Sequence, residues 1–264
     1  MDFGQYAVPP DLAPWVESIW TLRGVLAPDG QVILPDGRME LVIHFGAPPR
    51  VNGAAQPESV IAGQLRSALV LSPNGWMDAL GVRLRPEAGG CLAPAADLAG
   101  SLLDLQSVLG VWARRLREEI GNSADRPAAV VQALRRLLAG AIRPDPLIHW
   151  SIRAIEASHG CGGMDSFVPG ELRIRQWERR FLAAAGITPK ALARIARLQH
   201  VVALHEAGEW VRWADIAAEC GFYDQAHMAN DFRAFSGQSP DAYFRAGRGM
   251  VEFYRDGKFQ DAAR

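Results

Sequence analysis

Hydrophobic and polar residues follow two different periods along this chain. Up to about residue 95, short apolar or β-branched runs are separated by turn sequences rich in Pro, Asp, Asn and Gly; the runs include QVIL, RMELVIHF, ESVIAGQL, SALVLS and MDALGVRL. Strands divided by such turns are typical of antiparallel β structure. We therefore expect residues 1–95 to form an antiparallel β barrel, followed by helices in an α+β chain.

The clearest alternation lies in residues 39–45. One side of this strand carries Met39, Leu41, Ile43 and Phe45, and the other carries Glu40, Val42 and His44. Because successive side chains of a strand point to opposite faces, we expect one face to join the core and the other to line a cavity. Asp36, Glu40 and His44 are our candidates for contacts with a small molecule, although solvated carboxylates beside a turn and a partly buried histidine explain the same residues.

Helical spacing begins after the β region. Apolar residues recur at three or four positions in residues 96–144, namely Leu102, Leu105, Leu109, Trp112, Leu116 and Ile120. This stripe predicts an amphipathic helical linker from about Asp97 to Gly140, interrupted near residues 121–127. It suits either packing on the β domain, which we favour, or a dimer interface.

Residues 213–243 have the pattern of two short helices joined by a tight turn. The first helix has Ile216 and Ala217 as its inner face and ends at Gly221; Asp224 caps the second, which buries Met228, Phe232 and Phe235 and ends at Gly237. Each residue type suits its position, since Gly permits a positive φ and Asp accepts hydrogen bonds from free helical N–H groups. The segment is therefore predicted to be a helix-turn-helix.

An upstream segment repeats this plan. Ile174, Trp177 and Phe181 form a stripe, Gly186 ends that helix, and Thr188-Pro189 begins a long helix reaching about His205. The spacing from Phe181 to Pro189 equals that from Phe232 to Pro240, which indicates an internal repeat about fifty residues apart. The expected leading helix of this unit falls on CGGMDSFVPGE, where Pro-Gly favours a short or irregular segment.

The run from the alanine-rich helix through CGF, an aromatic-rich helix and a Gly-x-Ser-Pro turn resembles the second helix-turn-helix of AraC/XylS-type transcription regulators. The resemblance implies that residues 145–264 form an all-α domain with two helix-turn-helix units. Their recognition helices are expected to enter successive major grooves about 34 Å apart. Regulators of this family often have an N-terminal cupin-like barrel that senses a small molecule, and YAVPPDLAPWVESIW and LPDGRMELVIHFG resemble the N-terminal domain of one subgroup of such regulators.

The resemblance places the DNA contacts on the exposed faces of the two recognition helices. In the first unit these are Arg173, Arg175, Glu178, Arg179 and Arg180; in the second they are Gln225, Ala226, His227 and Asn230. Arginine can form two hydrogen bonds with guanine, and the amides of Gln225 and Asn230 can pair with the N6 and N7 edge of adenine. A packed helical hairpin that does not touch DNA is the alternative.

Charge distribution changes this picture more than net charge does. The net charge is -1, but residues 172–199 hold seven basic residues against Glu178 alone. This local excess of six positive charges is expected to face phosphates, although most charge runs are solvated helix faces. Three cysteines without a Cys-x-x-Cys pair, and the lack of a long apolar run or secretory leader, favour a cytoplasmic protein with no membrane segment, zinc site or disulfide framework.

No pattern indicates catalysis. His44 is the only histidine in the β region, and one imidazole cannot hold a catalytic metal; nucleophile-elbow, P-loop and dinucleotide motifs are also lacking. We expect no enzyme activity, cofactor or metal. The expected partners are double-stranded DNA and a small-molecule effector, with RNA polymerase and a second copy of the chain as further candidates. The alternatives are an N-terminal domain that binds no ligand and serves dimerisation or protein interaction, and an enzyme fused to a DNA-binding domain.

Overall fold

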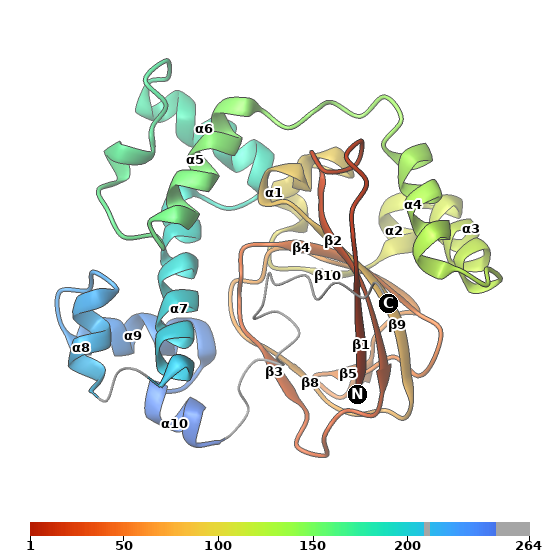
Figure 1. Ribbon diagram of the computed structural model, residues 1–264, viewed down its shortest axis with the longest axis horizontal. Helices are drawn as coiled ribbons and strands as arrows, with labels where there is room; N and C mark the ends of the chain where they lie inside the picture. Colours follow the sequence, from red (N-terminus) through yellow and green to blue (C-terminus); the bar gives the residue numbers. More distant parts are fainter. Residues whose placement is uncertain (209–211, 247–264) are drawn as a thin grey trace, which may run out of the picture.

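The chain forms an antiparallel β region followed by a helical region (Figure 1), and the computed structural model describes residues 1–208 and 212–246. The strands are β1 (Asp2–Tyr6), β2 (Val16–Gly24), β3 (Gln31–Ile33), β4 (Met39–His44), β5 (Arg50–Val51), β6 (Ala54–Ala55), β7 (Ser59–Ala62), β8 (Leu69–Leu71), β9 (Met77–Leu84) and β10 (Leu102–Asp104). Six of them form one sheet in the order β1-β2-β9-β4-β7-β10, while β3 pairs with β8 and β5 with β6. All pairings are antiparallel. The order of the large sheet is linear, so β1 and β10 remain its edges.

The two faces of β4 are used as the alternation predicts. Met39, Leu41 and Ile43 are buried in a core shared with helices that cover this face of the sheet. These helices are α2 (Leu105–Leu109), α3 (Val111–Gly121) and α4 (Arg126–Leu137). The residues Leu105, Leu116 and Ile120 of the apolar stripe lie in the same core, so these stripe positions pack within the chain.

The segment expected to be one interrupted helical linker is only partly helical. Helix α1 (Ala95–Leu98) ends after one turn, and residues 102–104 form β10, whose Leu103 lies opposite Ile61 of β7. The expectation of a helix through Leu102 was therefore wrong. Gly100 has φ 76° between the two elements, and a positive φ ends the helical path, after which the free edge of β7 supplies hydrogen bonds.

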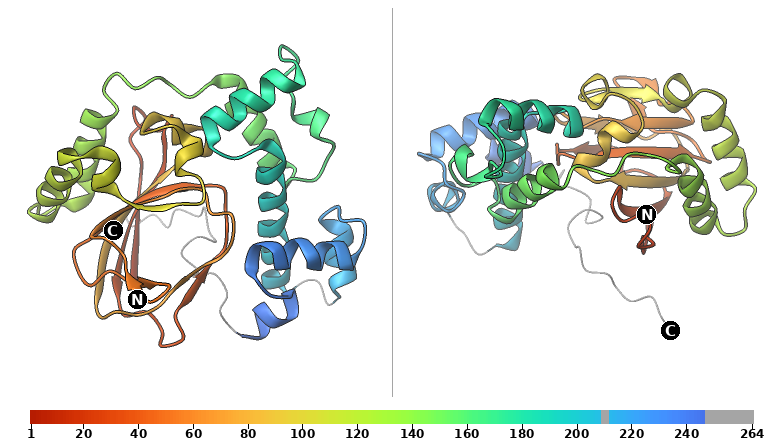
Figure 2. Two further views of the ribbon diagram at one scale, coloured as in Figure 1. Left: turned by 180° about the vertical axis from the view of Figure 1, so that it is seen from behind. Right: turned by 90° about the horizontal axis from the view of Figure 1, so that it is seen from above.

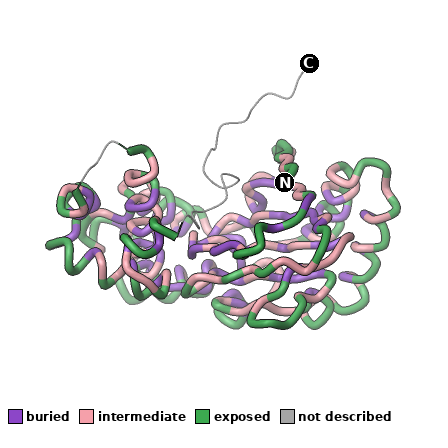
Figure 3. Tube along the Cα trace, turned by 90° about the horizontal axis from the view of Figure 1, so that it is seen from below, coloured by how far each residue is buried: buried purple, intermediate pink, exposed green. Residues whose placement is uncertain are grey.

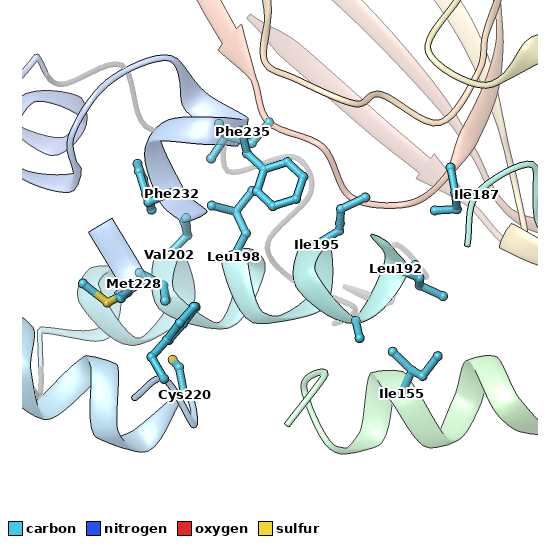
Figure 4. Packing of buried hydrophobic residues seen from close by; sticks show 14 of the residues in the cluster. Ile155, Ile187, Leu192, Ile195, Leu198, Val202, Cys220, Met228, Phe232 and Phe235 are labelled. Atoms are coloured by element: carbon cyan, nitrogen blue, oxygen red, sulfur yellow. The ribbon is translucent and has the colours of Figure 1, made fainter. Parts of the chain in front are cut away.

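Six helices make up most of the C-terminal region: α5 (Pro146–Ala157), α6 (Ile174–Ala185), α7 (Pro189–Ala207), α8 (Trp213–Glu219), α9 (Gln225–Ser236) and α10 (Pro240–Arg245). Helix α7 runs through the middle, with residues Leu198 and Val202 against Met228 and Phe232 of α9 (Figure 4). The tube in Figure 3 shows that buried positions of this region gather on the inner sides of its helices.

The predicted helix ends are confirmed. Asp224 accepts a hydrogen bond from His227 N at 2.7 Å, and Thr188 accepts one from Ala191 N at 3.1 Å. Gly186 and Gly237 end α6 and α9 in the left-handed conformation, with φ 73° and 79°. The leading helix of the first unit is a single 3-10 turn, Met164–Phe167, in agreement with its irregular sequence.

The β region and the helical region are packed against each other (Figure 2). The C-terminal end of α6 lies on α1 and on the 3-10 helix Pro86–Cys91, where Gly89 and Gly90 face the carbonyl oxygens of Ala184 and Ala183. Glu87 of the same 3-10 helix contacts Nδ1 of His149 in α5 at 2.5 Å. Val32 and Leu34 of the β region also join the core of the helical region.

Candidate nucleic-acid interface and ligand cavity

Helix α6 presents a polar face to solvent. Trp177 and Phe181 are buried, and the helical period then turns the opposite face outward. The exposed residues on and just before this helix include Arg173, Arg175, Glu178 and Arg179. Ile174, which was expected to belong to the apolar stripe, is 51% exposed, so that expectation was wrong.

Arg180 is placed differently from its neighbours. Its Nε donates to Asp145 Oδ2 at 2.7 Å, and its Nη2 binds the same oxygen. Asp145 also caps α5, since its Oδ1 accepts from Leu147 N at 3.0 Å. The guanidinium thus joins α6 to α5, and a contact between Arg180 and DNA remains a prediction.

Two further arginines of the basic segment turn toward α9 and the turn that precedes it. Arg194 donates to both carboxylate oxygens of Asp231 in α9, at 2.8 and 3.1 Å, and the Arg197 guanidinium lies over the Phe222 ring. The exposed positive charge is therefore smaller than the sequence count. Its exposed members are Arg173, Arg175, Arg179 and Lys190.

Helix α9 has the same two-sided construction. Met228, Phe232 and Phe235 are buried, and the predicted contact residues Gln225, Ala226, His227 and Asn230 are exposed. The exposed face also includes Arg233, one turn beyond Ala229. Tyr223, just before the cap, is 93% exposed. Sequence reasoning missed both residues, although an aromatic residue or an arginine beside a recognition helix is a usable signal for phosphate or sugar contacts.

The two helices are joined by α7. Its 19 residues make a rod about 28 Å long at the usual helical rise. Helix α6 precedes the first residue of α7, whereas α9 packs near Leu198 and Val202 toward its other end (Figure 4). The two exposed faces are thus held on one rigid element, as a two-site reader of a duplex requires.

Residues of the β region, together with Gln199 of α7, line a cavity of about 160 Å³. This is more than ten times the space that one water needs. The predicted ligand residues Asp36, Glu40 and His44 all line it, as does Val42. Most of the remaining wall is apolar, and sequence reasoning missed its other polar members, which are Gln31, Arg38, Gln56, Arg83 and Gln199.

Ion pairs occupy the end of the cavity near the helical region. Arg83 binds Asp36 at 2.5 Å and Glu40 at 2.8 Å. Arg38 binds Glu17 at 2.9 Å and reaches Glu156 of α5 at 2.6 Å. The charges at this end are therefore paired with one another, and one pair crosses from the cavity wall to the helical region.

His44 lies near the other end, four residues along β4 from Glu40. Its Nε2 faces Gln56 Oε1 at 3.1 Å, and burial lowers the pKa of His44 to about 4. The ring is therefore neutral at pH 7. Its Nδ1 has no hydrogen-bond partner among the described residues, and the same is true of Trp20 Nε1 and Gln31 Nε2 in the cavity wall.

The loop between β7 and β8, residues 63–68, touches the cavity and both of the exposed helices. Gly63 and Leu65 line the cavity. The Gln64 side chain donates to the carbonyl oxygen of Ala185, the last residue of α6. Ala68 N donates to Phe235 O near the end of α9 at 2.6 Å. We call residues 63–68 the clasp loop.

Among residues 1–208 and 212–246, no group of three or more His, Cys, Asp or Glu side chains is arranged to hold a metal ion. Within the same residues, no helix has both the length and the apolar character needed to cross a bilayer.

Comparison with known proteins divides the chain as the structure does. Residues 171–246 match a family described as a helix-turn-helix domain, and residues 5–103 match a domain of unknown function, DUF6597. No curated protein matches the chain.

Similar solved structures include ToxT from Vibrio cholerae O395, with 12% identity, 86% of this chain and 97% of that chain covered and a TM-score of 0.45. ToxT from Vibrio cholerae O395 bound to (E)-4-(8-methylnaphthalen-1-yl)but-3-enoic acid has 12% identity, 87% and 99% coverage and a TM-score of 0.47. Unsaturated fatty acid bound wild-type ToxT from Vibrio cholerae strain SCE256 has 13% identity, 84% and 94% coverage and a TM-score of 0.39.

Proposed function

We propose that this chain, whose residues 171–246 form an AraC-type helix-turn-helix domain, is a sequence-specific DNA-binding transcription regulator controlled by a small molecule in its N-terminal cavity. The observation that carries DNA binding is the pair of helices α6 and α9 on either end of α7. Each buries one face and presents arginine or amide side chains on the other, which are the side chains that read guanine and adenine.

Effector control is supported by the cavity. An N-terminal domain used only for dimerisation or protein interaction needs no internal space, and its interior is expected to be filled. Here the wall combines apolar residues with a few polar groups, which is the usual character of a small-molecule site. The proposed division assigns sensing to residues 1–95, with the helices that follow to residue 144 as their cover, and DNA binding to residues 145–264.

Selection from random duplexes tests the DNA-binding part. We expect the full chain to enrich two short elements whose centres are about one helical turn apart, or about 34 Å. Recovery of unrelated sequences, with equal affinity for selected and random DNA, would contradict it. Effector binding is tested separately by thermal shift across a panel of metabolites, because a ligand that binds only the folded state must raise Tm.

A further inference from the structure

We propose that the cavity binds a small uncharged molecule that has both a hydrogen-bond donor and an acceptor on a largely apolar frame. This inference rests on the proposed effector site and names its ligand class. It is carried by two features of the wall: its charged groups are paired, and three of its neutral polar atoms lack hydrogen-bond partners among the residues that the structure describes.

The charged groups are already satisfied by one another. Arg83 lies between Asp36 and Glu40, and Arg38 binds Glu17 and Glu156. A ligand ion would have to displace one of these partners and leave a buried charge without compensation, which is costly. The paired charges therefore disfavour both anionic and cationic ligands.

The neutral polar groups have unused hydrogen-bonding capacity. Trp20 Nε1 and Gln31 Nε2 are buried donors without partners in the described part of the chain. Gln56 Oε1 accepts from Nε2–H of the neutral His44, so His44 Nδ1 has a free lone pair and accepts. Buried polar groups are nearly always paired, and a ligand with an acceptor and a donor would pair these atoms.

The volume limits the size of the ligand. The cavity of about 160 Å³ is close to the roughly 150 Å³ of an engineered cavity that accepts benzene. A molecule with one ring, or an aliphatic frame of similar size, therefore fits. We accordingly choose single-ring probes that differ in charge and polar groups.

Calorimetric titration of the full chain with four probes tests the ligand class. The probes are 4-hydroxyacetophenone (uncharged, with donor and acceptor), 4-hydroxybenzoate (anion), tyramine (cation) and ethylbenzene (no polar group). We expect 4-hydroxyacetophenone to bind most tightly, and Trp20→Phe to weaken it about two- to tenfold by removing one donor. Trp150→Phe, at a half-exposed position outside the cavity wall, is the matched control and should leave binding unchanged.

Tighter binding of either charged probe, or binding of none of the four, overturns the ligand class. Operator selectivity is measured on the same protein preparation. If it persists while the uncharged probe fails, the ligand class is wrong and DNA binding stands; if selectivity is absent, the proposed function itself fails.

A different observation, the contacts of the clasp loop, carries a second inference. We infer that residues 63–68 couple the state of the cavity to the arrangement of the two recognition helices. The last carbonyl groups of a helix have no partner within the helix. The clasp loop supplies donors to one such carbonyl in α6 and another in α9, through Gln64 and Ala68.

The loop has little freedom to move without affecting these contacts. Gln64 is fully buried, and a side chain at Gly63 would overlap the carbonyl oxygen of Leu98. Because Gly63 and Leu65 also form part of the cavity wall, a displacement of the wall is passed to the ends of α6 and α9. The cavity and both helices therefore share one short segment.

A double-mutant cycle on operator affinity tests this coupling. Ala79→Leu fills the cavity near His44, opposite which Ala79 lies in the sheet. Gln64→Met keeps the side-chain length and removes the donor to Ala185. We expect Ala79→Leu to change operator affinity severalfold in the wild-type background and to have much less effect in the Gln64→Met background.

Independent effects of the two substitutions, which multiply in affinity as distant sites normally do, overturn the inference. An unchanged affinity for Ala79→Leu overturns it as well. Circular dichroism checks that each variant is folded, and Gln132→Ala, an exposed amide on α4, is the control for a glutamine change outside the loop. Gln64→Met should also broaden the tolerated spacing between the two operator elements.

Discussion

Asp145 and Arg180 form an ion pair that connects the first residue before α5 with the middle of α6. The same carboxylate caps α5, so one side chain links the start of α5 to α6. Arg179, the preceding residue, is exposed. We therefore expect adjacent arginines of the same helix to have separable roles, Arg179 in contacting DNA and Arg180 in holding α6 to α5.

We expect Arg179→Ala to lower affinity for the selected operator by about 1–3 kcal/mol and to relax preference at one base position. Arg180→Ala should instead lower the free energy of unfolding by at most about 1 kcal/mol, because the pair is partly solvated. Fluorescence anisotropy on operator and random duplexes, with thermal unfolding of both variants, separates the two effects. An equal loss of affinity on both duplexes would assign Arg179 to a phosphate contact.

In α9 the amides of Gln225 and Asn230 are both exposed, Gln225 at the first position of the helix and Asn230 on the side opposite Met228 and Phe232. Since each amide can pair with the N6 and N7 edge of adenine, Gln225→Ala and Asn230→Ala should each cost about 1–3 kcal/mol on the operator. The loss should be much smaller on random DNA. Gln132→Ala is again the control. Wild-type affinity and selectivity in both variants would show that these amides do not read bases and that α9 contacts only the sugar-phosphate backbone of the DNA.

Gly81 makes room for the ring of Trp20 in the cavity wall. The two residues lie opposite each other in β9 and β2, and a methyl group at Gly81 would overlap the indole. We expect Gly81→Ala to lower the free energy of unfolding by about 1–3 kcal/mol through overpacking, measured by urea denaturation. Gly163→Ala is the matched control, because φ is -69° there and no described atom lies within 4 Å of an added methyl group. An equal loss of stability in both variants would contradict the overlap with Trp20 as the cause.

Features set by neighbouring residues could be predicted from the sequence. The cap at Asp224, the end of α9 at Gly237 and the two faces of β4 each depend on residues within a few positions, and all are found. The same holds for the placement of Asp36, Glu40 and His44 at one cavity.

Features that depend on distant partners could not be predicted. Gln64 and Ala185 are 121 positions apart, and no periodicity connects them. The packing of α6 on α1 likewise gave no local signal, and the short strand β10 exists because β7 offers an edge. The inward turn of Arg180 and Arg194 also required carboxylates from other helices, so a count of basic residues overstated the exposed charge.

His44 makes the stability of the β region depend on pH. Its pKa is about 4 in the folded state, where burial disfavours the charged ring and the nearby Arg117 adds to the effect, and about 6.5 in the unfolded chain. Between these values the unfolded chain binds more protons. The free energy of unfolding therefore rises with pH through this window; the contribution is complete above about pH 6.5 and is lost as the pH falls to about 4.

We expect His44→Gln to remove this part of the pH dependence. The difference in unfolding free energy between wild type and variant should change by about 3 kcal/mol between pH 7 and pH 4, since each pKa unit corresponds to about 1.4 kcal/mol. Urea titrations at half-unit pH intervals measure it. His200 and His205, whose pKa values burial also lowers, remain in both proteins and cancel in the difference. A constant difference across the whole range would show that the His44 ring titrates alike in the folded and unfolded states, and that the cavity end holding it is open to water.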